Sequence, residues 1–127
     1  MKQIAAKITD SELAVMRVLW EAGTPVTVTQ VRKALMKKTK WNGDTIKTLL
    51  RRLCGKGAVL QEKREVYYYT PLVSQEAYEK YSTQQLIDKL YAGSARDMIA
   101  ALVKNDQLDA ADIDELRAMF RAGGGYA

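Results

Sequence analysis

Residues 41–57 read WNGDTIKTLLRRLCGKG, and this stretch is the strongest indicator of the fold in the sequence. Its apolar residues recur at the spacing of a single helical face: Ile46, Leu49, Leu50 and Leu53. At about 100° of rotation per residue, the opposite side carries Asp44, Thr48 and Arg51, with Lys47 and Arg52 at its flanks. A helix that buries its leucines and presents threonine, lysine and arginine is suited to the major groove of DNA. The stretch therefore predicts a DNA recognition helix.

Two shorter helices are predicted before this stretch. Thr9 and Glu12 have the spacing of a capping box, in which each side chain accepts a hydrogen bond from a backbone N–H at the helix start. Gly23 is expected to end that helix, because glycine tolerates a positive φ. Thr27 and Gln30 repeat the capping-box spacing and predict the start of a second helix.

A hairpin is predicted directly after the basic helix. Asn42 is a favourable cap for that helix, which is expected over residues 43–56. Ala58–Leu60 and Val66–Thr70 then read as two short strands, with a polar tip at residues 61–65. The order of helix, helix, basic helix and hairpin is that of a winged helix-turn-helix domain.

Three successive tyrosines in the second strand should face alternate sides of the hairpin. Tyr68 is expected in the core, and at least one of Tyr67 and Tyr69 is expected to face outward, within reach of a DNA phosphate. At the hairpin tip, Lys63 and Arg64 either contact the DNA backbone or minor groove, or form an ordinary solvated turn.

From Ser74 onward the sequence predicts three helices, over residues 74–91, over residues 95–104 and from Asp109 onward. Their apolar faces are too extensive to remain uncovered, so they are expected to pack between two copies of the chain. The alternative is that all three pack onto the winged domain of the same chain. The residues expected at the dimer interface are Tyr81, Leu86, Leu90, Met98, Leu102, Ile113, Leu116 and Phe120.

Charge is divided unevenly along the chain. Residues 1–73 hold 14 lysines and arginines against 6 aspartates and glutamates, whereas residues 74–127 hold 6 against 9. A cationic first part suits a polyanionic partner. We therefore expect a mainly α fold with a small β-hairpin: a winged-helix DNA-binding domain at residues 1–73, a helical dimerisation domain at 74–122 and a disordered tail at 123–127.

The candidate DNA-binding residues divide by their expected role. Those near the N-terminal half of the basic helix are candidates for reading base edges: Asn42, Asp44, Thr45, Thr48 and Arg51. Lys47 and Arg52, at the flanks, are expected to contact phosphates. Asp44 either accepts a hydrogen bond from a cytosine amino group or only stabilises the first turn of the helix.

Composition excludes several other functions. The chain of 127 residues has one cysteine, Cys54, and no histidine, so it has no internal disulfide, no Cys/His zinc site and no Ser-His-Asp or Cys-His catalytic group. No apolar run approaches the roughly 18 residues of a membrane span, and a cytoplasmic location without membrane insertion is expected. An enzyme is not expected. The alternatives to DNA binding alone are a winged domain used for protein–protein contact and a ligand-responsive regulator.

Several stretches together carry a resemblance to a known family. They are residues 8–20 (ITDSELAVMRVLW), 41–57, 67–71 and 91–120. The most specific positions as a group are Trp41, Thr45, Ile46, Thr48, Leu49, Arg52, Leu53 and Gly57. The chain resembles the BlaI/MecI/CopY family, the penicillinase and methicillin-resistance repressors and their copper-responsive relatives. This resemblance implies a homodimer on a palindromic DNA operator, with each recognition helix in a major groove and no cofactor.

The same resemblance has implications for control. Family members of the β-lactamase type are inactivated by proteolysis in the dimerisation region, triggered by a membrane sensor, between an asparagine and a phenylalanine. The matching positions here are Ala101 and Leu102, a departure that counts against control by such a protease. Copper-responsive members carry a C-terminal pair of Cys-x-Cys motifs that this sequence lacks, so no metal site is expected. Asp44 stands where the family often has a basic residue, which predicts a different operator.

Overall fold

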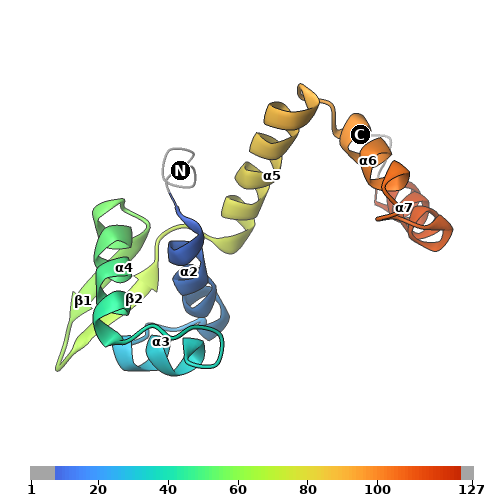
Figure 1. The fold of residues 1–127 in the computed structure, drawn as a ribbon. Coiled ribbons are helices and arrows are strands. Elements are labelled where there is room, and N and C mark those ends of the chain that lie inside the picture. The colour runs from blue at the N-terminus through green and yellow to red at the C-terminus, as the bar shows by residue number, and fades with distance from the viewer. Residues whose placement is uncertain (1–7, 124–127) are drawn as a thin grey trace. The chain divides into compact units, whose positions relative to one another are not determined.

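The structure is a computed structural model that describes residues 8–123. As predicted, these residues are mainly helical with one two-stranded antiparallel hairpin (Figure 1). The elements are α2 (Asp10–Ala22), α3 (Val28–Leu35), α4 (Gly43–Gly55), β1 (Val59–Lys63), β2 (Tyr67–Pro71), α5 (Gln75–Tyr91), α6 (Ala95–Lys104) and α7 (Ala110–Ala122). The chain divides between Thr83 and Gln84 into two compact units.

The two capping boxes predicted for the first helices are both formed. Thr9 accepts a hydrogen bond from the Glu12 backbone N–H at 3.2 Å, and Glu12 accepts one from the Thr9 backbone N–H at 2.9 Å. Thr27 and Gln30 make the equivalent pair at 3.2 and 2.8 Å. Gly23 ends α2 with φ of 67°, the left-handed conformation that favours glycine. These local signals fix where α2 and α3 begin, and therefore how α3 approaches α4.

One apolar core holds the first unit together. The helices α2, α3 and α4 supply most of it, and the predicted apolar face of α4 is buried in full. The buried residues of α4 are Ile46, Leu49, Leu50 and Leu53. Trp20 extends the core toward the start of α5: its indole N–H donates to the Val73 carbonyl at 2.8 Å, and its ring lies 5.7 Å from the Tyr78 ring.

The first hairpin strand is longer than the sequence predicted, whereas the second has the predicted length and is shifted by one residue. The polar segment at residues 61–65 is not a tip, because its first three residues continue β1 and Lys63 pairs with Tyr67. The turn is confined to residues 64–66 and is closed by a hydrogen bond from the Arg64 N–H to the Val66 carbonyl at 3.0 Å. Polar side chains are tolerated in β1 because its backbone groups pair with β2 while the side chains remain exposed.

The expected core role of Tyr68 is wrong. Tyr69 is the buried tyrosine, whereas Tyr68 is half-buried and Tyr67 is 45% exposed. The reason is a third short β-segment that the sequence reading missed. Val26 exchanges both backbone hydrogen bonds with Tyr69, at 3.1 and 2.7 Å, and this bridge holds the Tyr69 side of β2 against the helices.

In the second unit, α6 and α7 each begin after a capping residue, Ser94 and Asp109. Ser94 accepts a hydrogen bond from the Asp97 N–H, and Asp109 and Asp112 form a reciprocal capping box. The boundary between the units falls within α5, after the expected boundary at Val73, because the first part of α5 packs on α2 through Tyr78. Of the tail expected at residues 123–127, Gly123 caps α7 and residues 124–127 lie outside the described residues.

Candidate nucleic-acid interface

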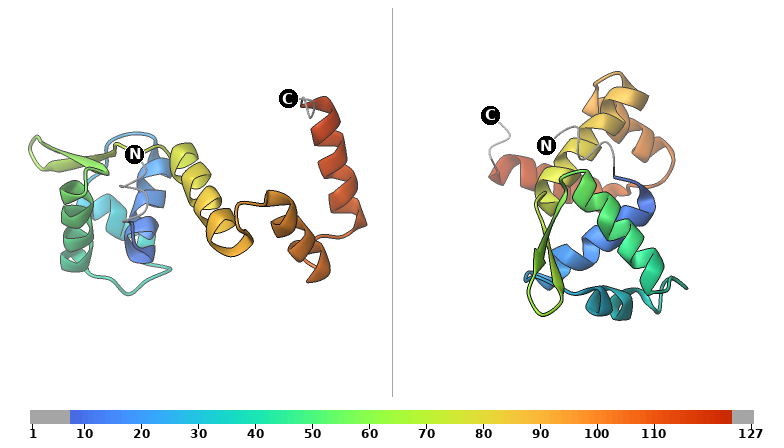
Figure 2. Two further views of the ribbon diagram at one scale, coloured as in Figure 1. Left: turned by 90° about the horizontal axis from the view of Figure 1, so that it is seen from above. Right: turned by 90° about the vertical axis from the view of Figure 1, so that its left-hand side faces the viewer.

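The helix α4 is held so that its basic side faces away from the core. Asn42 caps it, with its side-chain oxygen accepting a hydrogen bond from the Thr45 N–H at 2.9 Å. Its four large apolar residues are buried, and the hairpin lies beside it in both views of Figure 2. The candidate DNA-contacting residues that this leaves exposed are Asn42, Asp44, Lys47, Arg51 and Arg52. The arrangement presents a cationic helical surface on a rigid support.

Two of the expected base-reading residues are half-buried threonines with part of their hydrogen-bonding capacity already used. The Thr48 hydroxyl donates to the Asp44 carbonyl at 3.0 Å, so towards a base it offers acceptor lone pairs. Thr45 is also half-buried, and its N–H is bonded to Asn42. Because its oxygen serves as the cap, Asn42 has its amide N–H groups for any further contact. Of the five candidate base-reading residues, Arg51 has the longest side chain and can extend furthest toward a base.

The cations of α4 have no carboxylate partner within residues 8–123. The ion pairs in that part of the chain join Lys56 to Glu12 and Arg96 to Asp97. Lys47, Arg51 and Arg52 form none, and Asp44 is too far from any of these side chains to do so. A cluster of exposed, unneutralised cations produces a positive potential that attracts polyanions.

The hairpin places its three candidate DNA-contacting residues, Lys63, Arg64 and Tyr67, on two different faces. Lys63 lies directly opposite Tyr67 across the strands, and directly opposed residues project on the same face. The guanidinium of Arg64 instead lies 4.8 Å from the centre of the Tyr68 ring, in a cation–π contact. Because Tyr68 faces away from Tyr67 along the strand, the structure brings Lys63 and Tyr67 together and places Arg64 elsewhere.

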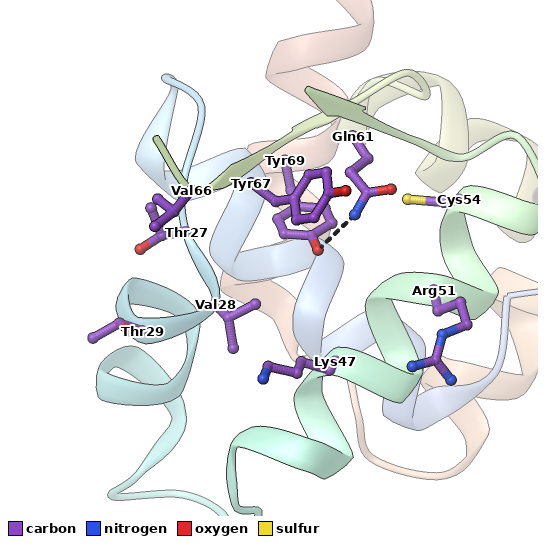
Figure 3. Close-up of a pocket in the computed structure, with 10 residues that line it drawn as sticks. All are labelled: Thr27, Val28, Thr29, Lys47, Arg51, Cys54, Gln61, Val66, Tyr67 and Tyr69. Carbon is purple, nitrogen blue, oxygen red and sulfur yellow. Dashed lines mark hydrogen bonds between the residues drawn. The ribbon is translucent and has the colours of Figure 1, made fainter. Parts of the chain in front are cut away.

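A concave groove of about 590 Å³ lies between α4, the start of α3 and the hairpin (Figure 3). Lys47, Arg51 and Tyr67 are the predicted site residues that it brings together. The remaining lining residues were not predicted: Thr27, Val28, Thr29, Cys54, Gln61, Val66 and Tyr69. The capping box at Thr27 marked the start of α3, but nothing local indicated that this helix start faces α4 and the hairpin. Burial raises the pKa of Cys54, which keeps its thiol protonated.

The residues expected to form a dimer interface differ in exposure. Leu86, Leu90, Leu116 and Phe120 are exposed, from 41% to 64%. The half-buried ones are Tyr81, Met98, Leu102 and Ile113. Three further apolar residues of α6 and α7 are exposed as well, namely Ile99, Val103 and Met119. They belong to the same apolar spacing from which the interface was predicted.

Ala101 and Leu102 lie inside α6, and both are half-buried. Their peptide bond is part of a regular helix. Within residues 8–123, no group of three or more Cys, Asp or Glu side chains is arranged to hold a metal ion. No helix in the same described range combines the length and apolar character needed to cross a membrane.

The fold and the basic face of α4 define a winged helix-turn-helix protein. Residues 8–122 match the family model described as penicillinase repressor, and the chain belongs to that family. It is 35% identical to the penicillinase repressor of Bacillus licheniformis over 117 residues, covering 91% of this chain and 90% of that protein. It is 27% identical to the methicillin resistance regulatory protein MecI of Staphylococcus aureus (strain N315), covering 87% and 90%.

The comparison with solved structures concerns the first unit. The chain is similar to the solution structure of the DNA-binding domain of the repressor BlaI, with 39% sequence identity and a TM-score of 0.52. The alignment covers 61% of this chain and 94% of that one. This similarity supports the winged-helix assignment independently of the hairpin and helix signals in the sequence.

Proposed function

We propose that this protein is a DNA-binding transcriptional repressor that places α4 in the major groove. The observation that carries the proposal is the pairing of a fully buried apolar face on α4 with an opposite face of exposed cations that no described carboxylate neutralises. Family membership and the similarity to the BlaI DNA-binding domain support it. A helix of 13 residues is about 20 Å long, which suffices to lie across several base pairs of a major groove.

Within this proposal the exposed residues take different roles. Arg51 and the Thr48 oxygen read base edges, because they lie on the side of α4 opposite its buried apolar face, and the half-buried Thr45 contributes from the edge of that side. Asn42 fixes the start of the helix and offers its amide N–H groups. Asp44 acts in the first turn, where a carboxylate stabilises the positive end of the helix dipole.

The phosphate contacts come from the flanks of α4 and from one face of the hairpin. Lys47 and Arg52 flank the base-reading side, and Lys63 lies with Tyr67 on one face of the hairpin. If about six phosphates are neutralised, log K for DNA should fall against log salt with a slope near −5. Arg64, stacked on Tyr68, contributes less in this arrangement than the sequence predicted.

We propose that two copies act together on a palindromic operator. Exposed apolar side chains occur on all three C-terminal helices, among them Leu90, Val103 and Phe120. Burying such residues against a second copy removes apolar surface from water at about 25 cal/mol per Å². A two-fold symmetric pair of recognition helices requires two half-sites in inverted orientation. The helical part from residue 74 to 122 is thus the dimerisation domain of this proposal.

The position of the Ala101–Leu102 bond bears on relief of repression by a membrane sensor-protease. A bond between Ala101 and Leu102 lies within α6, so α6 would have to unwind locally before a protease could reach it. The residues at this bond also differ from the Asn–Phe pair of the β-lactamase-type relatives. If proteolysis controls this protein, its protease must accept alanine and leucine.

The proposal is tested by footprinting the purified protein on the DNA upstream of its own gene. We expect protection of two half-sites about 10 base pairs apart or a multiple of that spacing. The matched variant Arg51→Ala should protect these half-sites only at a protein concentration about ten- to a hundredfold higher, while its circular dichroism and thermal unfolding match those of the wild type. Uniform, sequence-independent protection by both proteins would contradict specific repression.

A further inference from the structure

The groove between α3, α4 and the hairpin has the size of a small-molecule site. Its volume of about 590 Å³ falls within the range of roughly 300–1,000 Å³ typical of ligand pockets. Three successive elements of the chain, α3, α4 and the hairpin, supply its walls, and Figure 3 shows their side chains arranged around the hollow. Its position is set by the rigid core of the first unit, so the groove is formed before anything binds.

One wall of the groove is apolar and partly aromatic. Tyr67 and Tyr69 contribute rings from β2, Val66 precedes them in the turn, and Val28 faces them from α3. Val66 and Tyr67 are 55% and 45% exposed, so this wall is open to solvent when the groove is empty. Such a surface favours a flat apolar or aromatic group.

The other wall is cationic. Lys47 and Arg51 lie one turn apart on α4, and both line the groove. In Figure 3, Lys47 extends from α4 toward Val28. At the aromatic wall, the Gln61 amide donates to the Tyr69 hydroxyl at 3.1 Å. Because the Tyr69 oxygen accepts this bond, its own O–H can donate to an anion.

We propose that this groove binds a small aromatic anion, meaning one or two fused rings that carry a carboxylate or sulfonate. A DNA phosphate would satisfy Lys47 and Arg51 but would leave the wall of Val28, Val66 and Tyr67 without an apolar partner. A flat aromatic acid matches both walls at once. Because Lys47 and Arg51 are also the proposed DNA contacts, the anion competes with DNA; this consequence, unlike binding itself, rests on the proposed function.

The test titrates the full-length, DNA-free protein with 2-naphthoate and follows backbone amide shifts by NMR. We expect saturable binding with the largest shifts at Val28, Arg51 and Tyr67. The neutral isostere 2-naphthamide should bind about tenfold more weakly, since it loses the charge-assisted hydrogen bonds. Non-saturable shifts, shifts spread over the whole first unit, or equal binding of the two compounds would overturn the proposal.

Two matched pairs of variants locate the site. Arg51→Gln should weaken 2-naphthoate binding about tenfold, whereas Arg32→Gln, which removes an exposed arginine of α3 outside the groove, should leave it unchanged. Lys47→Gln and Lys33→Gln form a second pair in case Arg51→Gln does not fold. Equal affinity within each pair would overturn the proposal.

A final titration separates this proposal from DNA binding. 2-Naphthoate should raise the apparent Kd for duplex DNA linearly with its free concentration, by a factor of one plus that concentration divided by its own Kd. If the protein binds 2-naphthoate but no DNA at all, the proposed function fails and the groove assignment stands. If it binds DNA but not 2-naphthoate, the groove assignment alone fails.

Discussion

Lys56, at the C-terminal end of α4, forms an ion pair of 2.5 Å with Glu12 in the first turn of α2. The Glu12 side chain is 1% exposed and that of Lys56 is 24% exposed. Burial would raise the pKa of Glu12, but the hydrogen bonds from Lys56 and from the Thr9 N–H outweigh burial and lower it. The pair therefore ties one end of α4 to α2, while Asn42 caps the other end.

Glu12→Gln should make stability less dependent on pH. A lowered folded-state pKa means that the Glu12 contribution is present above the ordinary carboxyl pKa and is lost as the pH falls through the lowered value. At neutral pH the variant should lose about 1–2 kcal/mol of unfolding free energy. Urea unfolding of both proteins from pH 7 down to about pH 3 checks this. A difference in unfolding free energy between the two proteins that stays constant in acid would contradict the role of the charged pair.

Lys56→Met should be more destabilising than Glu12→Gln at neutral pH. It leaves the Glu12 carboxylate buried without its cation, for which the expected loss is about 3 kcal/mol. This loss of unfolding free energy should become smaller in acid, because a protonated Glu12 no longer requires a cation. The same urea series measures both variants, and the double variant should be more stable than Lys56→Met alone. A deficit for Lys56→Met that grows in acid would exclude this explanation.

Arg51→Ala and Lys47→Ala should affect DNA binding in different ways. Arg51 is proposed to read a base, so its loss should cost about 1–3 kcal/mol on the preferred sequence and relax the preference at one position. Lys47 is proposed to contact phosphate, so its loss should weaken binding to all sequences alike. Fluorescence anisotropy with the footprinted sequence and a scrambled duplex distinguishes the two effects. The assignment of Arg51 to base reading and Lys47 to phosphate contact is wrong if Lys47→Ala reduces the preference between the two duplexes more than Arg51→Ala does.

The two cations of the hairpin should differ in their contribution to salt dependence. Lys63 lies opposite Tyr67 on one face, whereas Arg64 is stacked on Tyr68. Lys63→Ala should reduce the steepness of the log K against log salt plot by about 0.9 for each subunit of the dimer, and Arg64→Ala should change it less. Anisotropy titrations at several salt concentrations measure both slopes. Equal changes would show that Arg64 leaves Tyr68 to bind DNA.

Substitutions on the exposed apolar residues of the C-terminal helices should break the dimer. Leu90→Glu and Phe120→Glu place charge on residues that are 60% and 64% exposed in one copy of the chain. In a dimer these positions would be buried, where an unpaired carboxylate is strongly unfavourable. Sedimentation equilibrium should give twice the chain mass for the wild type and the single-chain mass for both variants. The control Lys89→Glu, on the same helix as Leu90, should remain a dimer.

Local signals were enough to predict the helices and their caps. The capping boxes at Thr9 and Thr27 and the apolar spacing of α4 each depend on residues within one or two helical turns, and the structure forms all of them. Alternation along β2 could not reveal which tyrosine faces the core, because that depends on the bridge from Val26 to Tyr69, 43 positions later in the chain.

The parts of the site that could not be predicted depend on long-range contacts. Glu12 was identified as a capping residue, but its ion pair joins it to Lys56, 44 residues away. The groove brings Val28, Lys47 and Tyr67 together from three elements. Periodicity in the sequence does not predict that these residues lie close together, because their proximity depends on how α3, α4 and the hairpin pack on one core.

In the proposed repressor, the α4 helices of two copies of the chain read the two halves of one DNA site. Selection from a random duplex library with the full-length protein measures this. We expect the wild type to enrich an inverted repeat, and Arg51→Ala to lose its preference at the same position in both half-sites. Recovery of no common sequence by the wild type, or of the same repeat by both proteins, would contradict it.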